Sequence, residues 1–329
     1  MCMTENNIIK LGDSRDLLLE LKERSVQSIY FDPPFNSSRI YSLSTEDNLG
    51  FNDKFSSKDE YISLIEPMIK SMTTILKSNG SFFYHISAAQ MLAAHYLCDK
   101  YFKRVQPIFW RRSRSKNNIK NKLGACTDVI FWCSNADKPK FNMVYQPLDS
   151  YYLENSYKNS DSRGFYALGH LVYTKTQSTK NTKRLYSVEH DGRIYAPSSG
   201  WRLSKKDLLS LIDDDRVHFP SKLKANPYKK LYKHESPGKP CTDNWDDIHS
   251  IAQGSQARLY PTQKPTSLLE RIIKMSTDEG DIVLDPVAGG GTTGVVASEL
   301  NRKFILFDKN EEAVEICKNR LKGVSYVSD

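Results

Sequence analysis

The chain has 329 residues, of which 39% are apolar and 26% charged, so most of it should fold, as one large or two ordinary domains. Its net charge of +8 favours a polyanionic partner, although charge alone does not separate DNA from RNA or an acidic membrane. No apolar run approaches the roughly 18 residues of a membrane span, and the N-terminus lacks the layout of a signal peptide. The six cysteines have no metal-binding spacing, which predicts reduced thiols in a cytoplasmic protein and no metal site.

Strands and helices alternate in the N-terminal part of the chain. Strands are predicted at residues 8–11, 28–31 and 81–86, and helices at 16–24, 60–77 and 88–99. Pro67 lies within one of these helices and is a candidate kink, whereas the polar residues 36–57 are typical of a loop. This alternation predicts an α/β fold with a parallel sheet.

The composition changes after this region. Residues 100–126 hold nine Lys or Arg and no acidic residue, and residues 134–258 are rich in Tyr, Ser, Asn and Lys with weak periodicity. From residue 259 the α/β pattern returns. The predicted organisation is therefore one α/β domain in two parts, 1–110 and 255–329, interrupted by a basic insert over 111–254.

The second part contains a glycine turn between a strand and a helix. The apolar strand 281–284 ends at Asp285, and Gly289, Gly291 and Gly294 follow with GxGxxG spacing before a helix over 295–300. Glycines permit positive φ and a close approach of the backbone to a ligand. The next strand, 304–307, ends at Asp308, where an acid can accept hydrogen bonds from both ribose hydroxyls. This pattern predicts a site for an adenosine-containing cofactor, and the turn alone does not exclude NAD.

Topology narrows the choice of cofactor. Only one predicted helix, 311–321, follows Asp308, so no third strand remains for a dinucleotide half-sheet. The sheet must then be completed from the N-terminus, with 8–11 as third strand and 28–31 as its neighbour. Because ligands bind outside the carboxyl ends of such strands, we expect Asp13, Asp32, Asp285 and Asp308 to converge.

The strand 28–31 runs into Asp32-Pro33-Pro34-Phe35. A carboxylate, a proline-restricted carbonyl and an aromatic ring suit a flat base held by its exocyclic amino group. The aromatic ring would stack on a base that has left the duplex. A core role for Phe35 after a strand is the alternative.

These motifs and their order resemble the β-class amino methyltransferases of bacterial restriction-modification systems. In that family the catalytic tetrad precedes the target-recognition region and the S-adenosylmethionine (SAM) motif comes last. The resemblance covers about 1–110 and 255–329 and includes Thr262-Gln263-Lys264-Pro265. It implies a Rossmann-like SAM-dependent methyltransferase sheet with circularly permuted motif order and an inserted target-recognition region.

Residue roles follow from the resemblance. It assigns catalysis to Asp32, Pro33, Pro34 and Phe35, and cofactor binding to Asp13, Thr262, Lys264, Asp285, Gly289, Gly291, Thr292 and Asp308. Val287 and Gly290 depart from the usual Phe and Ser beside the cofactor, which should alter its affinity without removing binding. Phe35 replaces the more usual Tyr, which keeps the stacking face and loses a hydroxyl.

Basic residues of the insert are candidates for phosphate contacts. They are Arg111, Arg112, Arg114, Lys116, Lys222 and Lys224, with Lys229, Lys230 and Lys233 in the same late run. For any single residue, a solvated basic surface is the alternative. We expect the insert as a whole to contact DNA.

The predicted function is site-specific transfer of a methyl group from SAM to N6 of adenine in duplex DNA after base flipping. N4 of cytosine is the alternative target, since Ser is the commoner first tetrad residue in N4 enzymes without being a strict rule. More distant alternatives are an RNA or protein-amide methyltransferase, a catalytically silent DNA-binding subunit and a NAD-dependent oxidoreductase. The expected setting is the cytoplasm of a bacterium or phage host, at the nucleoid. A cognate restriction endonuclease and a second copy of the chain are candidate partners.

Overall fold

The computed structural model describes residues 6–34, 39–42, 50–53, 57–113, 121, 123–222, 225–251 and 259–328. They form two compact units, one of residues 1–144 with 240–329 and one of residues 145–239. The smaller unit lies within the stretch that was predicted as the insert. Each unit has a core of its own and is described separately.

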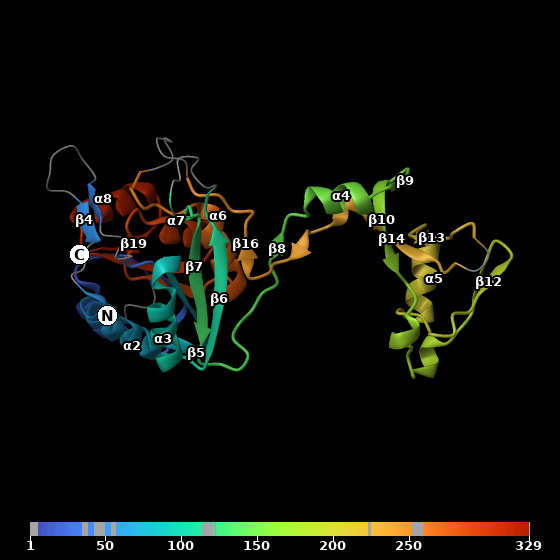
Figure 1. Ribbon diagram of the computed structural model, residues 1–329, viewed down its shortest axis with the longest axis horizontal. Coiled ribbons are helices and arrows are strands. Elements are labelled where there is room, and N and C mark those ends of the chain that lie inside the picture. Colours follow the sequence, from blue (N-terminus) through green and yellow to red (C-terminus); the bar gives the residue numbers. More distant parts are fainter. Residues whose placement is uncertain are drawn as a thin grey trace. The chain divides into compact units, whose positions relative to one another are not determined.

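A nine-stranded sheet forms the centre of the larger unit (Figure 1). Strand β7 runs antiparallel to β5 and β6, and the other pairings are parallel. The strand order is β16 (Asn244–Trp245), β6 (Arg104–Arg111), β7 (Thr127–Ser134), β5 (Leu76–Ser87), β2 (Val26–Phe31), β17 (Ile282–Asp285), β18 (Lys303–Asp308), β1 (Asn7–Leu11) and β19 (Tyr326–Val327).

Helices cover both faces of this sheet, which explains why its central strands are apolar on both sides. Figure 1 shows α2 and α3 on one face and α6 and α7 on the other. On β2, Ile29 and Phe31 belong to the first core and Tyr30 to the second. The helices are α1 (Ser14–Leu17), α2 (Lys58–Ile75), α3 (Met91–Tyr101), α6 (Thr266–Ser276), α7 (Thr292–Glu299) and α8 (Glu311–Arg320), with short 3-10 turns at Leu18–Glu20 and Ala88–Gln90.

The α/β class and the permuted order are confirmed, whereas one neighbour relation was wrong. Strand β1 pairs with β18 as expected, but β2 pairs with β17 and is separated from β1 by two strands. The segment predicted as a loop over 36–57 contains a hairpin of β3 (Arg39–Ser42) and β4 (Gly50–Asp53). Helix α2 continues through Pro67 and ends where the long strand β5 begins.

The smaller unit is built on a four-stranded antiparallel sheet in the order β13 (Val217–His218), β14 (Tyr228–Tyr232), β10 (Gly164–His170) and β9 (Asn159–Asp161). Trp201 and Leu208 lie in its hydrophobic core. The remaining elements are α4 (Ser150–Ser156), α5 (Lys205–Asp213), the hairpin of β11 (Val188–His190) and β12 (Arg193–Tyr195), the pair β8 (Tyr145–Gln146) and β15 (Lys239–Pro240), and 3-10 turns at Lys175–Gln177, Thr182–Arg184 and Lys233–Glu235.

Candidate active site

Four carboxylates lie at the carboxyl ends of four adjacent strands of the large sheet. In strand order they are Asp32 after β2, Asp285 at the end of β17, Asp308 at the end of β18 and Asp13 after β1. Ligands of open α/β sheets bind outside these strand ends. The sheet therefore brings together residues that the sequence separates into two distant groups.

The glycine turn after β17 has the backbone that its sequence demands. Gly289 and Gly291 have φ values of +51° and +70°, in the left-handed region that favours glycine. Gly291 caps the N-terminus of α7, and a Cβ placed on it would lie 2.7 Å from Sγ of Cys317. The turn thus requires glycine both for its conformation and for its packing against α8.

Two acidic side chains hold this turn in different ways. Asp308 accepts hydrogen bonds from the backbone N–H of Gly289 at 2.8 Å and of Asn310 at 2.9 Å. An ionised carboxylate has about four acceptor positions, so these two bonds do not use all of them. Asp285 is buried and accepts from Thr293 Oγ1 at 2.5 Å and from the Val287 N–H at 3.1 Å. Through these two hydrogen bonds, Asp285 stabilises the conformation of the turn from the protein interior.

Burial raises the pKa of both carboxyls. The pKa of Asp285 rises to about 7, and the charges of Asp32 and Asp308 add to the effect of burial, while the bonds from Thr293 and Val287 oppose it. The pKa of Asp308 is also raised, mainly by burial, against the opposing bonds from Asn310 and Gly289. The site therefore disfavours further negative charge, as a site for a cationic ligand would.

The segment 260–265 lies directly over the glycine turn. The Tyr260 ring is so close that a Cβ on Gly289 would meet it at 3.1 Å. Four residues further on, the Lys264 ammonium forms an ion pair with Oδ2 of Asp32. The segment thus contacts the glycine turn through Tyr260 and Asp32 through Lys264, and the Lys264 ammonium also lies 3.5 Å from the Thr262 carbonyl.

The other predicted cofactor residues have protein partners of their own. Asp13 caps helix α1 and binds the Arg15 guanidinium, which lowers the pKa of the Asp13 carboxyl. The Thr292 hydroxyl accepts from Arg320 at 3.1 Å, and Arg320 also donates to the Gly290 carbonyl. Arg320 could not be predicted from the sequence, since only the packing of α8 brings it to the turn.

Within the tetrad, Asp32 is partly buried, Pro33 is buried and Pro34 is partly buried. Phe35 lies outside the described residues. Oδ1 of Asp32 lies 3.6 Å from Nδ1 of His85 on the adjacent strand β5. The Asp32 carboxylate is thus flanked by a lysine on one side and a histidine on the other.

His85, Tyr30 and Asp128 were not singled out from the sequence. Its ring is fully buried, with the Tyr30 hydroxyl 2.6 Å from Nδ1 and an Asp128 carboxylate oxygen 3.4 Å from Nε2. Asp128 in turn accepts from Nε of Arg112 at 3.0 Å. A lone histidine within the aromatic strand 81–86 was the available signal, although its partners come from other strands.

The basic candidates fall into three groups. Arg111, at the carboxyl end of β6, and Lys222, in the smaller unit, are exposed. Arg112 is half-exposed but engaged by Asp128. The remaining candidates, Arg114, Lys116 and Lys224, lie outside the described residues.

Lys230 does not belong with the phosphate-binding candidates. It is buried and forms ion pairs with Asp161 at 2.8 Å and Asp215 at 3.0 Å. The Tyr232 hydroxyl also donates to Asp161. Because these bonds join β9 to β14, Lys230 stabilises the small sheet, and its place in the basic run was misleading.

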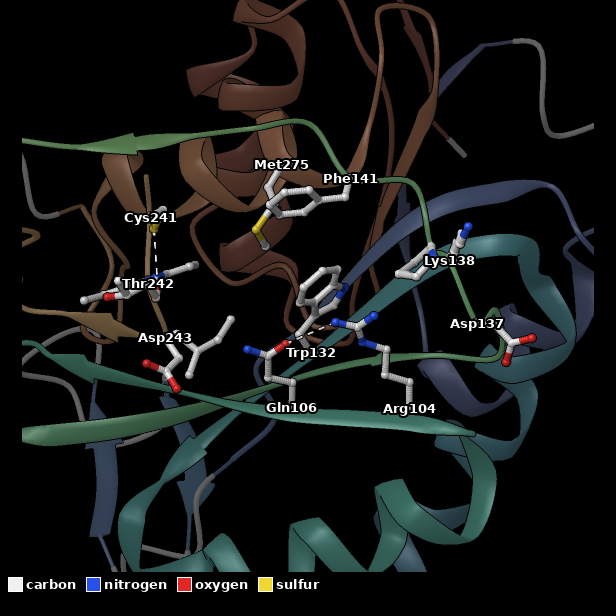
Figure 2. Close-up of a pocket in the computed structure, with 13 residues that line it drawn as sticks. Arg104, Gln106, Trp132, Asp137, Lys138, Phe141, Cys241, Thr242, Asp243 and Met275 are labelled. Carbon is white, nitrogen blue, oxygen red and sulfur yellow. Dashed lines mark hydrogen bonds between the residues drawn. The ribbon is translucent and has the colours of Figure 1, made fainter. Parts of the chain in front are cut away.

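A cavity of about 430 Å³ lies elsewhere in the larger unit. Figure 2 shows Arg104 and Gln106 on one side of Trp132, with Phe141 and Met275 on its other side. The Arg104 guanidinium lies 5.0 Å from the Trp132 ring centre. The residues that line the cavity begin at the amino end of β6 and include none of the four carboxylates at the strand ends. The cavity is therefore separate from the predicted site.

Two absences hold for the part of the chain that the structure describes. No group of three or more His, Cys, Asp or Glu side chains is arranged to hold a metal ion there. Within the same residues, no helix is long and apolar enough to cross a membrane.

The fold and the site define a Rossmann-like α/β protein with a ligand-binding glycine turn. The family model described as DNA methylase (N6_N4_Mtase) matches residues 26–319, and the chain belongs to this family. It is 26% identical to the type II methyltransferase M.EcaI of Enterobacter cloacae over 92% of the chain, and 26% identical to the DNA adenine methyltransferase YhdJ of Escherichia coli over 96%.

The chain spans 83% of YhdJ, 66% of M.EcaI and 52% of another curated relative. Among solved structures, the cytosine-N4-specific PvuII DNA methyltransferase is similar, with a TM-score of 0.55 and 17% identity. That match covers 98% of this chain and 89% of the other. At this identity, the likeness shows the shared fold.

Proposed function

We propose that this chain transfers a methyl group from SAM to N6 of adenine in duplex DNA. The observation that carries the proposal is the placement of Asp32 at the end of β2, beside β17 and its glycine turn. A base-binding carboxylate and a cofactor turn on neighbouring strands are what a direct transfer between two bound substrates requires. Membership of the DNA methylase family supports the same reaction class.

The residues around the turn fit SAM. Asp308 has acceptor positions left for ribose hydroxyls, and the positive-φ glycines Gly289 and Gly291 leave the backbone open to a close ligand. Thr262 and Lys264 would close over the methionine end, and Asp13 would lie near the adenine. When bound, SAM would supply an electrophilic methyl group on a positively charged sulfur.

Asp32 and Pro33 would prepare the amino group for attack. The nitrogen lone pair is delocalised into the base, which makes the amino group a poor nucleophile. The Asp32 carboxylate and the Pro33 carbonyl can each accept one N–H bond, which favours a tetrahedral nitrogen with a directed lone pair. Charge-assisted bonds of this kind are roughly twice as strong as neutral ones. Lys264 fixes one oxygen of Asp32 and so limits its rotation.

Adenine is proposed over cytosine because the tetrad begins with Asp instead of Ser. The target base would leave the duplex and stack on Phe35. Arg111, Arg112, Arg114, Lys116, Lys222 and Lys224 would contact phosphates, with target recognition in the insert. A DNA substrate implies work in the bacterial cytoplasm at the nucleoid. A cognate restriction endonuclease and a second copy of the chain are the proposed protein partners.

The test is methyl transfer from tritiated SAM to duplex DNA, followed by digestion to nucleosides and mass spectrometry. We expect N6-methyladenine, whereas N4-methylcytosine would reassign the base and leave the reaction class intact. Asp32→Ala should abolish transfer while SAM binding persists, since loss of a key acceptor costs about 2–4 kcal/mol of transition-state stabilisation. Turnover of Asp32→Ala within about tenfold of wild type would refute the role of Asp32.

A further inference from the structure

A line of polar side chains runs inward from the catalytic carboxylate. It passes from Asp32 to His85 and then to Asp128, with nitrogen–oxygen distances of 3.6 and 3.4 Å. Arg112 ends the line through its 3.0 Å bond to Asp128. The four residues come from the ends of β2, β5, β7 and β6, so the line crosses the sheet from strand to strand.

Burial of these polar side chains lowers the stability of the fold, so their presence calls for a functional reason. His85 is 0% exposed and Asp128 is 4% exposed, whereas apolar residues fill the neighbouring positions of β5 and β7. Replacing buried polar networks by apolar side chains of similar volume is often neutral or stabilising. Fold stability alone therefore gives little reason for a histidine and an aspartate at these positions.

The partners fix the orientation of the imidazole. An ionised carboxylate only accepts hydrogen bonds, so the imidazole is the only possible donor in its contacts with Asp128 and Asp32. Nε2 faces Asp128, and Nδ1 faces both Asp32 and the Tyr30 hydroxyl, which lies 2.6 Å from it. Burial and the charge of Asp32 raise the pKa of Tyr30 well above its usual value, so its hydroxyl keeps its proton. A carboxylate that orients a histidine in this way acts on its neighbour without itself reacting.

We propose that His85 and Asp128 are positioning residues that hold the Asp32 carboxylate in its base-binding orientation. Lys264 holds one oxygen of Asp32, and His85 faces the other. Asp128 acts through His85 by fixing its ring, and Arg112 holds Asp128 in turn. The inference rests on the proposed function, because it assigns these residues to the same methyl transfer.

The test compares His85→Leu, His85→Gln and Asp128→Asn in the full chain. Single-turnover methyl transfer to DNA, SAM affinity by calorimetry, DNA affinity and melting temperature are measured for each variant. Leu preserves the apolar volume of the core, whereas Gln retains a donor that can reach Asp128. The matched control is His95→Ala, which removes an exposed histidine of α3.

We expect His85→Leu to lower the transfer rate by about 10- to 100-fold, as misplacement of a reacting group by about 1 Å can do. SAM and DNA affinities should change little. The melting temperature should fall, because His85→Leu leaves the buried Asp128 with one partner fewer, so transfer is measured at a temperature where each variant is folded. His85→Gln should recover part of the rate. The double variant His85→Leu/Asp128→Asn should lose no more than His85→Leu alone, because Asp128 acts through His85.

Each other outcome has a defined meaning. A His85→Leu rate within about twofold of wild type would overturn the inference while the wild-type activity upholds the proposed function. A lost rate with an equal loss of SAM or DNA affinity, and without recovery in His85→Gln, would reduce His85 to a structural residue. If the wild-type chain transfers no methyl group to DNA, the proposed function fails and the inference fails with it.

Discussion

The buried carboxyl of Asp285 makes a quantitative prediction about stability and pH. Its folded-state pKa of about 7 lies above the usual value of 3.8. In the unfolded chain the group is therefore ionised from about pH 5 upwards, whereas in the folded state it keeps its proton to about pH 7. The stability that this group contributes is complete below the unfolded pKa and is lost as pH rises through the folded pKa.

The size of the pH-dependent change in unfolding free energy follows from the rise in the pKa of Asp285 on folding. Folding retains about one proton on Asp285 between pH 5.5 and 7, and each pH unit in this window is worth about 1.4 kcal/mol. The free energy of unfolding should therefore fall by roughly 2 kcal/mol between pH 5.5 and 8.5 through this one group. Asp285→Asn should lack that component, and Thr293→Val, which removes an opposing hydrogen bond, should shift the fall to higher pH.

Urea unfolding measured by tryptophan fluorescence can isolate the larger unit. Trp110, Trp132 and Trp245 lie in it, and Trp201 lies in the smaller unit, so a Trp201→Phe background removes the second signal. The quantity compared is the difference in unfolding free energy between wild type and Asp285→Asn at several pH values. A difference that stays constant between pH 5.5 and 8.5 would refute the raised pKa. Asp308 is present in both proteins, so its titration cancels apart from its electrostatic coupling to Asp285.

Three further predictions concern the ligands and the turn. Asp308→Ala should raise the SAM dissociation constant, since each lost hydrogen bond to a charged acceptor costs about 1.5–3 kcal/mol. DNA affinity should be nearly unchanged. If calorimetry finds an unaltered SAM affinity, the assignment of Asp308 to the ribose is rejected. Arg111→Ala should lower the slope of the logarithm of DNA affinity against the logarithm of salt concentration by about 0.9. Arg112→Lys should keep this slope and lower the transfer rate. If a salt titration gives the same slope for wild type and Arg111→Ala, Arg111 is a solvated side chain that contacts no phosphate. Gly291→Ala should destabilise the larger unit by about 2–4 kcal/mol through its positive φ and the clash with Cys317. Gly280→Ala, in the same unit with positive φ and no atom within 4 Å of the added Cβ, is the control for φ alone, and equal losses would contradict the clash.

The sequence by itself determined the features that depend on local chemistry. The apolar runs before Asp285 and Asp308 predicted strands, and the glycines at 289 and 291 predicted a turn with positive φ, because only glycine adopts it without strain. The order of the motifs, with Asp32 ahead of the glycine turn, predicted the permuted sheet. These inferences needed only periodicity, residue conformational preference and motif order.

Tertiary structure decided which side chains meet. Lys264 reaches Asp32 across 232 residues, and β2 pairs with β17 instead of β1, because strand neighbours are chosen by packing over the whole sheet. The same holds for the line from Asp32 through His85 to Asp128. Sequence also cannot tell a solvated cation from a buried one, so the basic run around Lys230 did not reveal the ion pairs that bury it. Burial and pairing of charges are properties of the assembled fold, and they decide both the electrostatics of the site and the availability of its basic residues.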